Sequence, residues 1–174
     1  MASPTVDLDL ERTKDLAGRS WQPWIRRAAL TAMLAVVAAG LAGVFGQVEH
    51  TSRAANTSAA AEVRVPQSLR GGLYWPAHIR IQARERIVAP VVVLGSGFID
   101  GMQLNSLTPT PTSESTRDGH LVYAYPTLDA GDVLDVRLQL QVNPTTVGRE
   151  DLSVRVEGDG LDPITIPRSV RVMP

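Results

Sequence analysis

Cysteine is absent from this chain of 174 residues, and lysine occurs only once, at Lys14. The lack of cysteine excludes disulfides, a thiolate nucleophile and a cysteine-ligated metal site. An exported domain of this sequence would therefore have to be stable on its hydrophobic core alone. The formal net charge of −1 also gives no basic footprint, so we expect no nucleic-acid partner.

Sequence motifs that carry chemistry are missing as well. The three histidines, His50, His78 and His120, show no metal-ligand spacing, and Ser96 in LGSGF lacks the G-x-S-x-G pattern of a nucleophile elbow. We therefore predict no catalytic residue, no metal and no cofactor, and so a protein that is not an enzyme. The alternative is a hydrolase that acts on envelope material, which would need a histidine in a cleft against two carboxylates.

Two acidic clusters, Asp129–Asp135 and Glu157–Asp162, also lack a binding pattern. Calcium needs six to eight oxygen ligands, and the full D-x-[DN]-x-[DN]-G pattern of a calcium loop does not occur in either cluster. Asp-Gly pairs are common in turns because both residues tolerate turn conformations. We expect structural turns at both places.

Charge is absent over one long stretch, Ala28–Phe45, which reads AALTAMLAVVAAGLAGVF. Its length is at the lower limit for a membrane-spanning helix, and Trp21 and Trp24 before it suit the headgroup layer. We predict a transmembrane helix over residues 25–45, with the lipid bilayer as its partner. Arginines precede the stretch at positions 19, 26 and 27, and only Arg53 follows closely. The positive-inside rule then places residues 1–24 in the cytoplasm, as a disordered tail, and the rest of the chain outside.

A cleavable signal peptide is the rival interpretation of this stretch. The apolar core of such a peptide is about 7–15 residues long, which is shorter than Ala28–Phe45. Ala59–Ala61 offers small residues for a cleavage site, but these lie far beyond the apolar end. We favour an uncleaved anchor.

The remainder of the chain shows the pattern of an all-β domain. Residues 46–61 are small and polar, which predicts a flexible linker, and residues 62–174 have the size of one domain. Alternation is clearest over Asp132–Gly158, and Gly, Pro and Asp separate the alternating runs. We predict an immunoglobulin-like β-sandwich of about seven strands. The expected strands are Glu62–Val65, Ala77–Ala83, Val88–Leu94, Leu121–Ala124, Val133–Val142, Leu152–Glu157 and Ser169–Val172.

The segment LDAGDVLDVRLQLQVNPTTVGREDLSVRVEG resembles the closing half of bacterial immunoglobulin-like repeats of the CARDB and DUF11 type. The resemblance rests on the turn residues Leu128, Gly131, Asp132, Pro144 and Gly148, and on the alternating strand residues between and after them. It implies a sandwich fold and an adhesive or scaffolding module without an active site.

The least regular part of the predicted domain is Gly95–Gly119, which contains a Thr-Pro repeat. Loops on a rigid sandwich often carry recognition, so we predict the binding residues there. They are Phe98, Ile99, Thr108, Pro109, Thr110 and Pro111, with Phe98 and Ile99 filling either the end of the sandwich or an apolar contact. The predicted function is a single-pass, membrane-anchored binding or scaffolding module outside the cytoplasm. It would serve as an accessory subunit of a membrane or envelope complex, with another membrane or envelope protein as partner.

Overall fold

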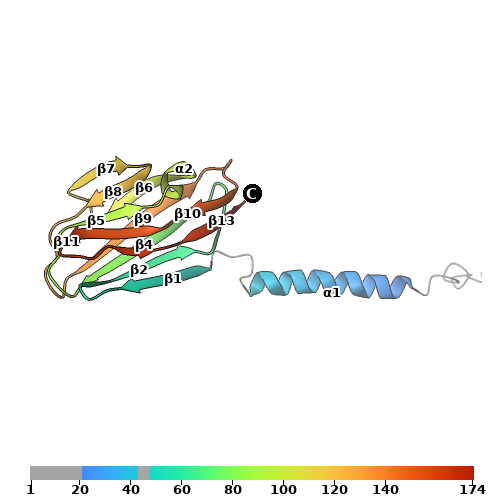
Figure 1. Ribbon diagram of the computed structural model, residues 1–174. Helices are drawn as coiled ribbons and strands as arrows, with labels where there is room; N and C mark the ends of the chain where they lie inside the picture. The colour runs from blue at the N-terminus through green and yellow to red at the C-terminus, as the bar shows by residue number, and fades with distance from the viewer. Residues whose placement is uncertain (1–20, 43–47) are drawn as a thin grey trace, which may run out of the picture. The chain divides into compact units, whose positions relative to one another are not determined.

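The computed structural model describes residues 21–42 and 48–174, which fall into a helical unit and a β unit (Figure 1). The helical unit is α1 (Gln22–Leu41), a helix of 20 residues with a proline in its first turn. At 1.5 Å per residue it is about 30 Å long, which matches the hydrocarbon core of a bilayer. By length and composition α1 can therefore cross a membrane.

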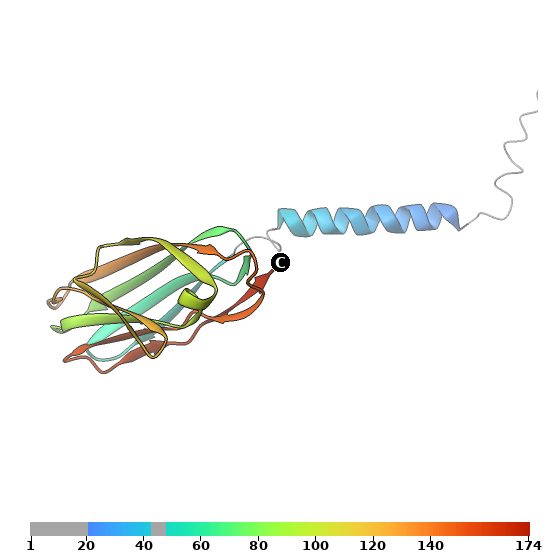
Figure 2. The same ribbon diagram turned by 90° about the horizontal axis from the view of Figure 1, so that it is seen from above.

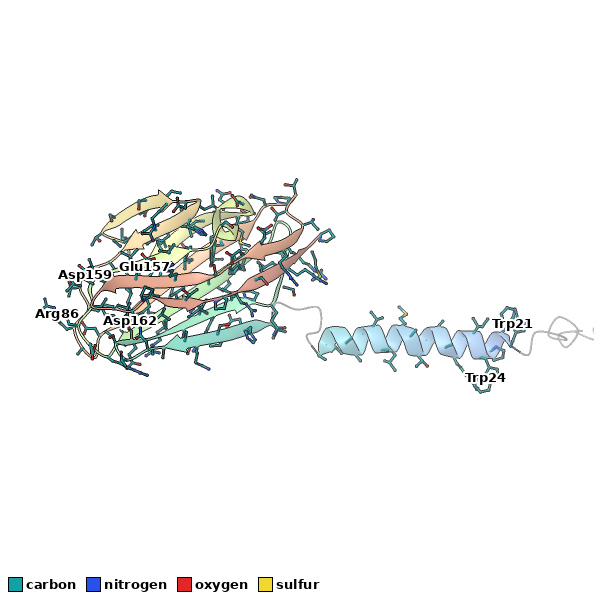
Figure 3. The ribbon with its side chains drawn as sticks, viewed as in Figure 1. Trp21, Trp24, Arg86, Glu157, Asp159 and Asp162 are labelled. Atoms are coloured by element: carbon teal, nitrogen blue, oxygen red, sulfur yellow. The ribbon has the colours of Figure 1, made fainter. Side chains whose placement is uncertain are left out.

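The bounds of α1 differ slightly from the predicted span of 25–45. The helix begins at Gln22, because Pro23 is tolerated in a first turn, and it ends at Leu41. Residues 22–24 therefore belong to the helix and not to the predicted tail. Residues 1–20 of that tail and residues 43–45 of the predicted span lie outside the described part. Trp21 and Trp24 lie at the N-terminal end of α1 (Figure 3), where the guanidinium of Arg27 stands 5.6 Å from the ring centre of Trp24.

One layer of the β unit is an antiparallel sheet of five strands in the order β1-β2-β4-β9-β6. The strands are β1 (Glu49–Ala55), β2 (Ala59–Pro66), β4 (Tyr74–Ala83), β9 (Val133–Val142) and β6 (Met102–Thr108). The alternation of apolar and polar residues along each strand decides which face of the sheet is buried and which is exposed. Leu134, Val136 and Leu138 of β9 are buried, and Asp135 and Arg137 between them are exposed.

The other side of the β unit is formed by two sheets. One has five strands in the order β12-β11-β5-β8-β7, and the other has three in the order β10-β13-β3. A short helix, α2 (Gly97–Asp100), follows β5. The strands are β3 (Ser68–Arg70), β5 (Val88–Leu94), β7 (Ser113–Arg117), β8 (His120–Ala124), β10 (Gly148–Asp151), β11 (Val154–Asp159), β12 (Ile164–Ile166) and β13 (Ser169–Met173). Only β13 and β3 pair in parallel among these strands.

The inward side chains of all three sheets form a single hydrophobic core. Its largest fully buried members include Trp75 of β4, Phe98 of α2 and Tyr125 after β8. The rings of Trp75 and Phe98 lie 6.3 Å apart between their centres. The predicted all-β sandwich is therefore confirmed, and each of the seven expected strands overlaps a strand of the structure.

Six further strands were not expected: β1, β3, β6, β7, β10 and β12. As a result, the predicted linker over residues 46–61 and the predicted long loop Gly95–Gly119 are both too long. Residues 49–55 and 59–61 of the predicted linker are strand, because β1 pairs with β2 along its whole length, from Glu49 opposite Pro66 to Ala55 opposite Ala60. The predicted long loop Gly95–Gly119 contains α2, β6 and β7, so the irregular part shrinks to the turn around Pro109–Thr112.

Candidate functional site

The predicted binding residues lie in two separate places. Phe98 is 1% exposed and packs against Trp75, so it fills the sandwich and cannot touch a partner while the domain is folded. Its role as a contact residue is therefore wrong. Ile99, the next residue of α2, is 37% exposed and stays available for contact.

The Thr-Pro segment is a surface turn that joins the two layers. Thr108 is the last residue of β6 and lies opposite Arg137 of β9, and Ser113 begins β7 in the other layer. Thr108, Pro109 and Thr110 are exposed, and Pro111 is half-buried. Thr112 holds the turn to β8, because both its backbone N–H and its hydroxyl donate to the carbonyl of Ala124, at 2.8 and 3.0 Å.

Beside this turn, the outward face of the five-stranded sheet is rich in arginine. Two adjoining hollows, of about 540 and 290 Å³, lie on this face and share Glu62 and Arg80 as lining residues. The charged residues that line them are Arg53, Arg64, Arg80, Arg84, Arg137, Glu62 and Asp135, and we call this surface the arginine face. Five arginines and two carboxylates give it a formal charge of +3, although the whole chain has a net charge of −1.

Strand register builds the arginine face. In one row across the sheet, Arg53 of β1 lies opposite Glu62 of β2, which lies opposite Arg80 of β4, which lies opposite Asp135 of β9. In the next row Arg64 lies opposite His78, His78 opposite Arg137, and Arg137 opposite Thr108. The predicted Thr-Pro turn therefore borders the arginine face at the β6 edge.

Ion pairs fix part of this surface and leave part of it free. Glu62 accepts hydrogen bonds from Arg64 at 2.6 Å and from Arg53 at 2.8 Å, and these two bonds lower the pKa of the Glu62 carboxyl. Asp135 accepts from Arg137 at 2.9 Å. Within residues 48–174, Arg80 has no ion-pair partner within 4 Å, although it stands in register between the two carboxylates. Its guanidinium is therefore free to bind an external carboxylate.

Two histidines lie in hollows that contain carboxylates, which is the arrangement that a hydrolase would need. His78 lines the smaller hollow of the arginine face together with Glu62 and Asp135. Both of these carboxylates are engaged by arginines, and the pKa of Glu62 is lowered. A general acid at neutral pH needs the opposite shift. The arrangement around His78 is thus a lattice of ion pairs, and it does not resemble an acid–base pair.

His120 occupies a similar setting on the outer face of the other layer. It lines a hollow of about 340 Å³ with Asp118 and Glu157, and its Nδ1 lies 3.1 Å from the carbonyl oxygen of Leu94. Glu157 pairs with Arg117 and with Arg155, both at 2.9 Å. Here too the arginines hold the carboxylate, and the histidine is bound to the backbone.

Each acidic cluster contains a turn at one end of the sandwich, at residues 130–131 and at Gly160, but Asp135 belongs to β9 and Glu157 and Asp159 belong to β11. Asp132 accepts a hydrogen bond from the backbone N–H of Asp129 at 2.9 Å, and Arg86 lies 3.5 Å from the carboxylate of Asp129. Asp159 and Asp162 lie near Arg86 at this end (Figure 3). Across residues 21–42 and 48–174, no group of three or more His, Asp or Glu side chains could hold a metal ion.

Comparison with known proteins gives fold likeness only. No protein-family model and no curated protein matches the chain. One similar solved structure is AvmM, which catalyses macrocyclization in alchivemycin A biosynthesis; it is 9% identical over 68% of this chain and 90% of its own, with a TM-score of 0.45. Another is a non-cellulosomal cohesin from the hyperthermophilic archaeon Archaeoglobus fulgidus, 10% identical over 62% of this chain and 87% of its own, with a TM-score of 0.40. At such values neither likeness bears on function, and the CARDB and DUF11 resemblance stays a prediction beyond the β-sandwich that it implied.

Proposed function

We propose that the protein is a single-pass membrane protein that binds a partner through the arginine face of its β-sandwich. Helix α1 anchors the chain in the cell membrane, with the N-terminus in the cytoplasm and residues 48–174 outside. The partner is another membrane or envelope protein with an acidic surface, and the chain is an accessory or scaffolding subunit of their complex. Uncharged side chains over 28–45 and the arginines at positions 19, 26 and 27 support this anchor and orientation.

An uncleaved anchor is also supported by the position of Ala59–Ala61. These residues lie in β2, and Ala59 and Ala61 are 0% and 2% exposed in the core. Cleavage there would remove β1 and the start of β2 from the five-stranded sheet. The loss of a paired edge strand would expose the inner residues of β2 and the backbone groups of its neighbour. Two of the three alanines that suggested a cleavage site, Ala59 and Ala61, therefore serve as core residues.

The observation that carries the binding proposal is the free guanidinium of Arg80 within a surface of formal charge +3. The neighbouring arginines are held in place by Glu62 and Asp135, so the surface is ordered before a partner binds. Arginine binds carboxylates through two parallel N–H groups, which gives both strength and orientation. A pre-ordered arginine lattice suits an acidic protein surface, and the adjoining Thr-Pro turn extends the contact area.

The test is the recovery of partners from detergent-solubilised membranes with Arg80→Glu. We expect recovery to fall about tenfold relative to the wild type, because the reversed charge repels an acidic partner. Arg155→Glu is the charge-reversal control on the opposite layer, on β11, where Arg155 is exposed and pairs with Glu157. Replacement of residues 108–112 by a Gly/Ser linker should also lower recovery without unfolding the domain. Equal recovery with Arg80→Glu and the wild type would show that partners do not use the arginine face.

A further inference from the structure

The β unit has one end that is distinct in composition, and it is the end at which the described chain enters. The backbone N–H of Gln67 donates to the carbonyl of Val48 at 3.0 Å, and the N–H of Gly71 donates to the carbonyl of Met173 at 3.0 Å. The start of β1 and the C-terminus accordingly lie at the same end in both ribbon views (Figures 1 and 2). We call this the Val48 end; it comprises Val48, residues 70–74, residues 142–149 and residues 171–173.

Exposed apolar side chains concentrate at the Val48 end. Val48, Leu73, Tyr74 and Val147 are 52%, 45%, 59% and 60% exposed. Leu73 and Tyr74 adjoin the end of β9, because the N–H of Val142 donates to the carbonyl of Leu73 at 3.0 Å, and Val147 follows β9 five residues later. Clustered apolar side chains of this kind indicate a contact surface.

Three arginines accompany the apolar side chains. Arg149 of β10 lies directly opposite Arg171 of β13, and both are exposed, because the buried Val170 and Val172 alternate with Arg171. Arg70 of β3 lies opposite Met173 in the parallel pair. None of the three arginines has an ion-pair partner within residues 48–174. Like charges directly opposite each other destabilise a sheet, and an anion bound between them would relieve this repulsion.

Arginines and apolar groups share one surface here. Val147, Arg149, Arg171 and Met173 line a common shallow hollow. Among the carboxylates near this end, Glu49 is on β1 in the opposite layer and Asp100 is on α2. The exposed Asp151 ends β10, and its carboxylate accepts hydrogen bonds from the N–H and the hydroxyl of Ser153. Glu150 is half-buried beside Gly101. The exposed charged residues of β10, β13 and β3 are thus Arg70, Arg149, Arg171 and Asp151, which give this side a formal charge of +2.

We propose that the Val48 end docks on the anionic headgroups of the bilayer that α1 spans, with Arg70, Arg149 and Arg171 on phosphates and Leu73, Tyr74 and Val147 in the interface. This inference rests on the proposed function in one respect, the anchoring by α1. Only the seven residues from Ala42 to Val48 follow Leu41, and a fully extended chain of that length covers at most ~25 Å. Tyrosine and arginine beside apolar side chains are the composition of a lipid interface.

The opposite end of the sandwich has a different chemistry, which supports the choice of a lipid surface. Asp159 and Asp162 lie at that end with Arg86 (Figure 3), and Arg86 pairs with Asp129, whose backbone N–H donates to Asp132. Anionic headgroups would repel that acidic end. An anionic lipid surface would therefore attract the Val48 end of the domain and repel the opposite end.

The experiment uses the absence of cysteine, because a single introduced cysteine can be spin-labelled without background. The full chain is placed in nanodiscs at one copy per disc, with Val147→Cys as the probe and Asp162→Cys as the control. The discs contain phosphatidylcholine mixed with anionic phosphatidylglycerol. We expect the label at 147 to be severalfold less accessible to a water-soluble nickel chelate, and more accessible to oxygen, than the label at 162. Addition of Arg149→Glu and Arg171→Glu should remove most of that difference.

Two results would overturn the docking proposal. One is equal nickel accessibility of the labels at 147 and 162 in single-copy discs. The other is protection of position 147 only when two copies share a disc, since a second copy would then be the occupant. Incorporation into the disc reports separately on the anchor. A chain that elutes apart from the discs contradicts the proposed function. A chain that is incorporated into the discs, but whose label at 147 is as accessible to nickel as the label at 162, contradicts only the docking.

Discussion

At the residue scale, the buried and exposed faces of β9 give the sharpest contrast. Leu138 is 2% exposed in the core, and Gln139 lies half-buried on the outward face. Leu138→Asp would bury a carboxylate without a partner and should lower the free energy of unfolding by on the order of 3–5 kcal/mol. Gln139→Asp should cost less than about 0.5 kcal/mol. Urea unfolding of the β unit measures both, and equal losses would mean that β9 is buried on two faces.

Glu62 should make stability depend on pH in the acidic range. The hydrogen bonds from Arg64 and Arg53 lower its pKa in the folded state, so the unfolded chain binds more protons as the pH falls. The contribution of Glu62 is therefore present above about pH 4.3, the ordinary value for glutamate, and is lost as the pH falls through the lower folded value. The stability difference between the wild type and Glu62→Gln should shrink over this window in urea unfolding at several pH values. A difference that stays constant across the window would contradict the ion pairs.

At the scale of elements, the packing of α2 on β10 depends on a glycine. A Cβ added at Gly97 would stand 2.7 Å from the carbonyl oxygen of Asp151 and 2.8 Å from its backbone nitrogen. Both are backbone atoms that cannot turn away, so Gly97→Ala should destabilise the domain by roughly 1–3 kcal/mol. Ser96→Ala, at the neighbouring half-buried position, is the control and should change stability by less than about 0.5 kcal/mol. Thermal unfolding compares the two, and a neutral Gly97→Ala would show that α2 can move away from β10.

Strong alternation is what made some elements predictable from the sequence. β9 places a large aliphatic residue at every second position, and its bounds are those predicted, whereas β11, with only Val154 and Val156 in alternation, begins and ends two residues later than predicted. β1 was missed because its inward positions are His50, Ser52 and Ala54, which give no hydrophobic pattern. Its strand conformation comes from pairing with β2, which is a tertiary effect. β7 has five exposed residues, so burial leaves no trace of it in the sequence.

At the scale of the whole molecule, the candidate binding surface could not be predicted from the sequence. The arginines of the face come from β1, β2, β4 and β9 and from the bend after β4, and only the strand register brings them together. The alternation along each strand shows that each arginine points outward, but it does not show which residues lie opposite it on the neighbouring strands. The Thr-Pro turn was found from composition, and its position beside Arg137 follows from β6, which was not expected. The sequence left two roles open for Phe98, and the choice of the sandwich filling over the contact depends on its packing against Trp75 of a distant strand.

Protease protection would show whether α1 anchors the chain in the membrane with the sandwich outside. Cells would carry the chain with one epitope tag at each end, and protease would be added to spheroplasts. We expect the N-terminal tag to survive on a short membrane-bound fragment while the C-terminal tag is lost, and both tags to be lost after lysis with detergent. Digestion of the N-terminal tag with survival of the C-terminal tag in intact spheroplasts would contradict this expectation. A mature chain that begins after Phe45 would contradict it equally, because α1 would then be a cleaved signal and the sandwich would have no anchor.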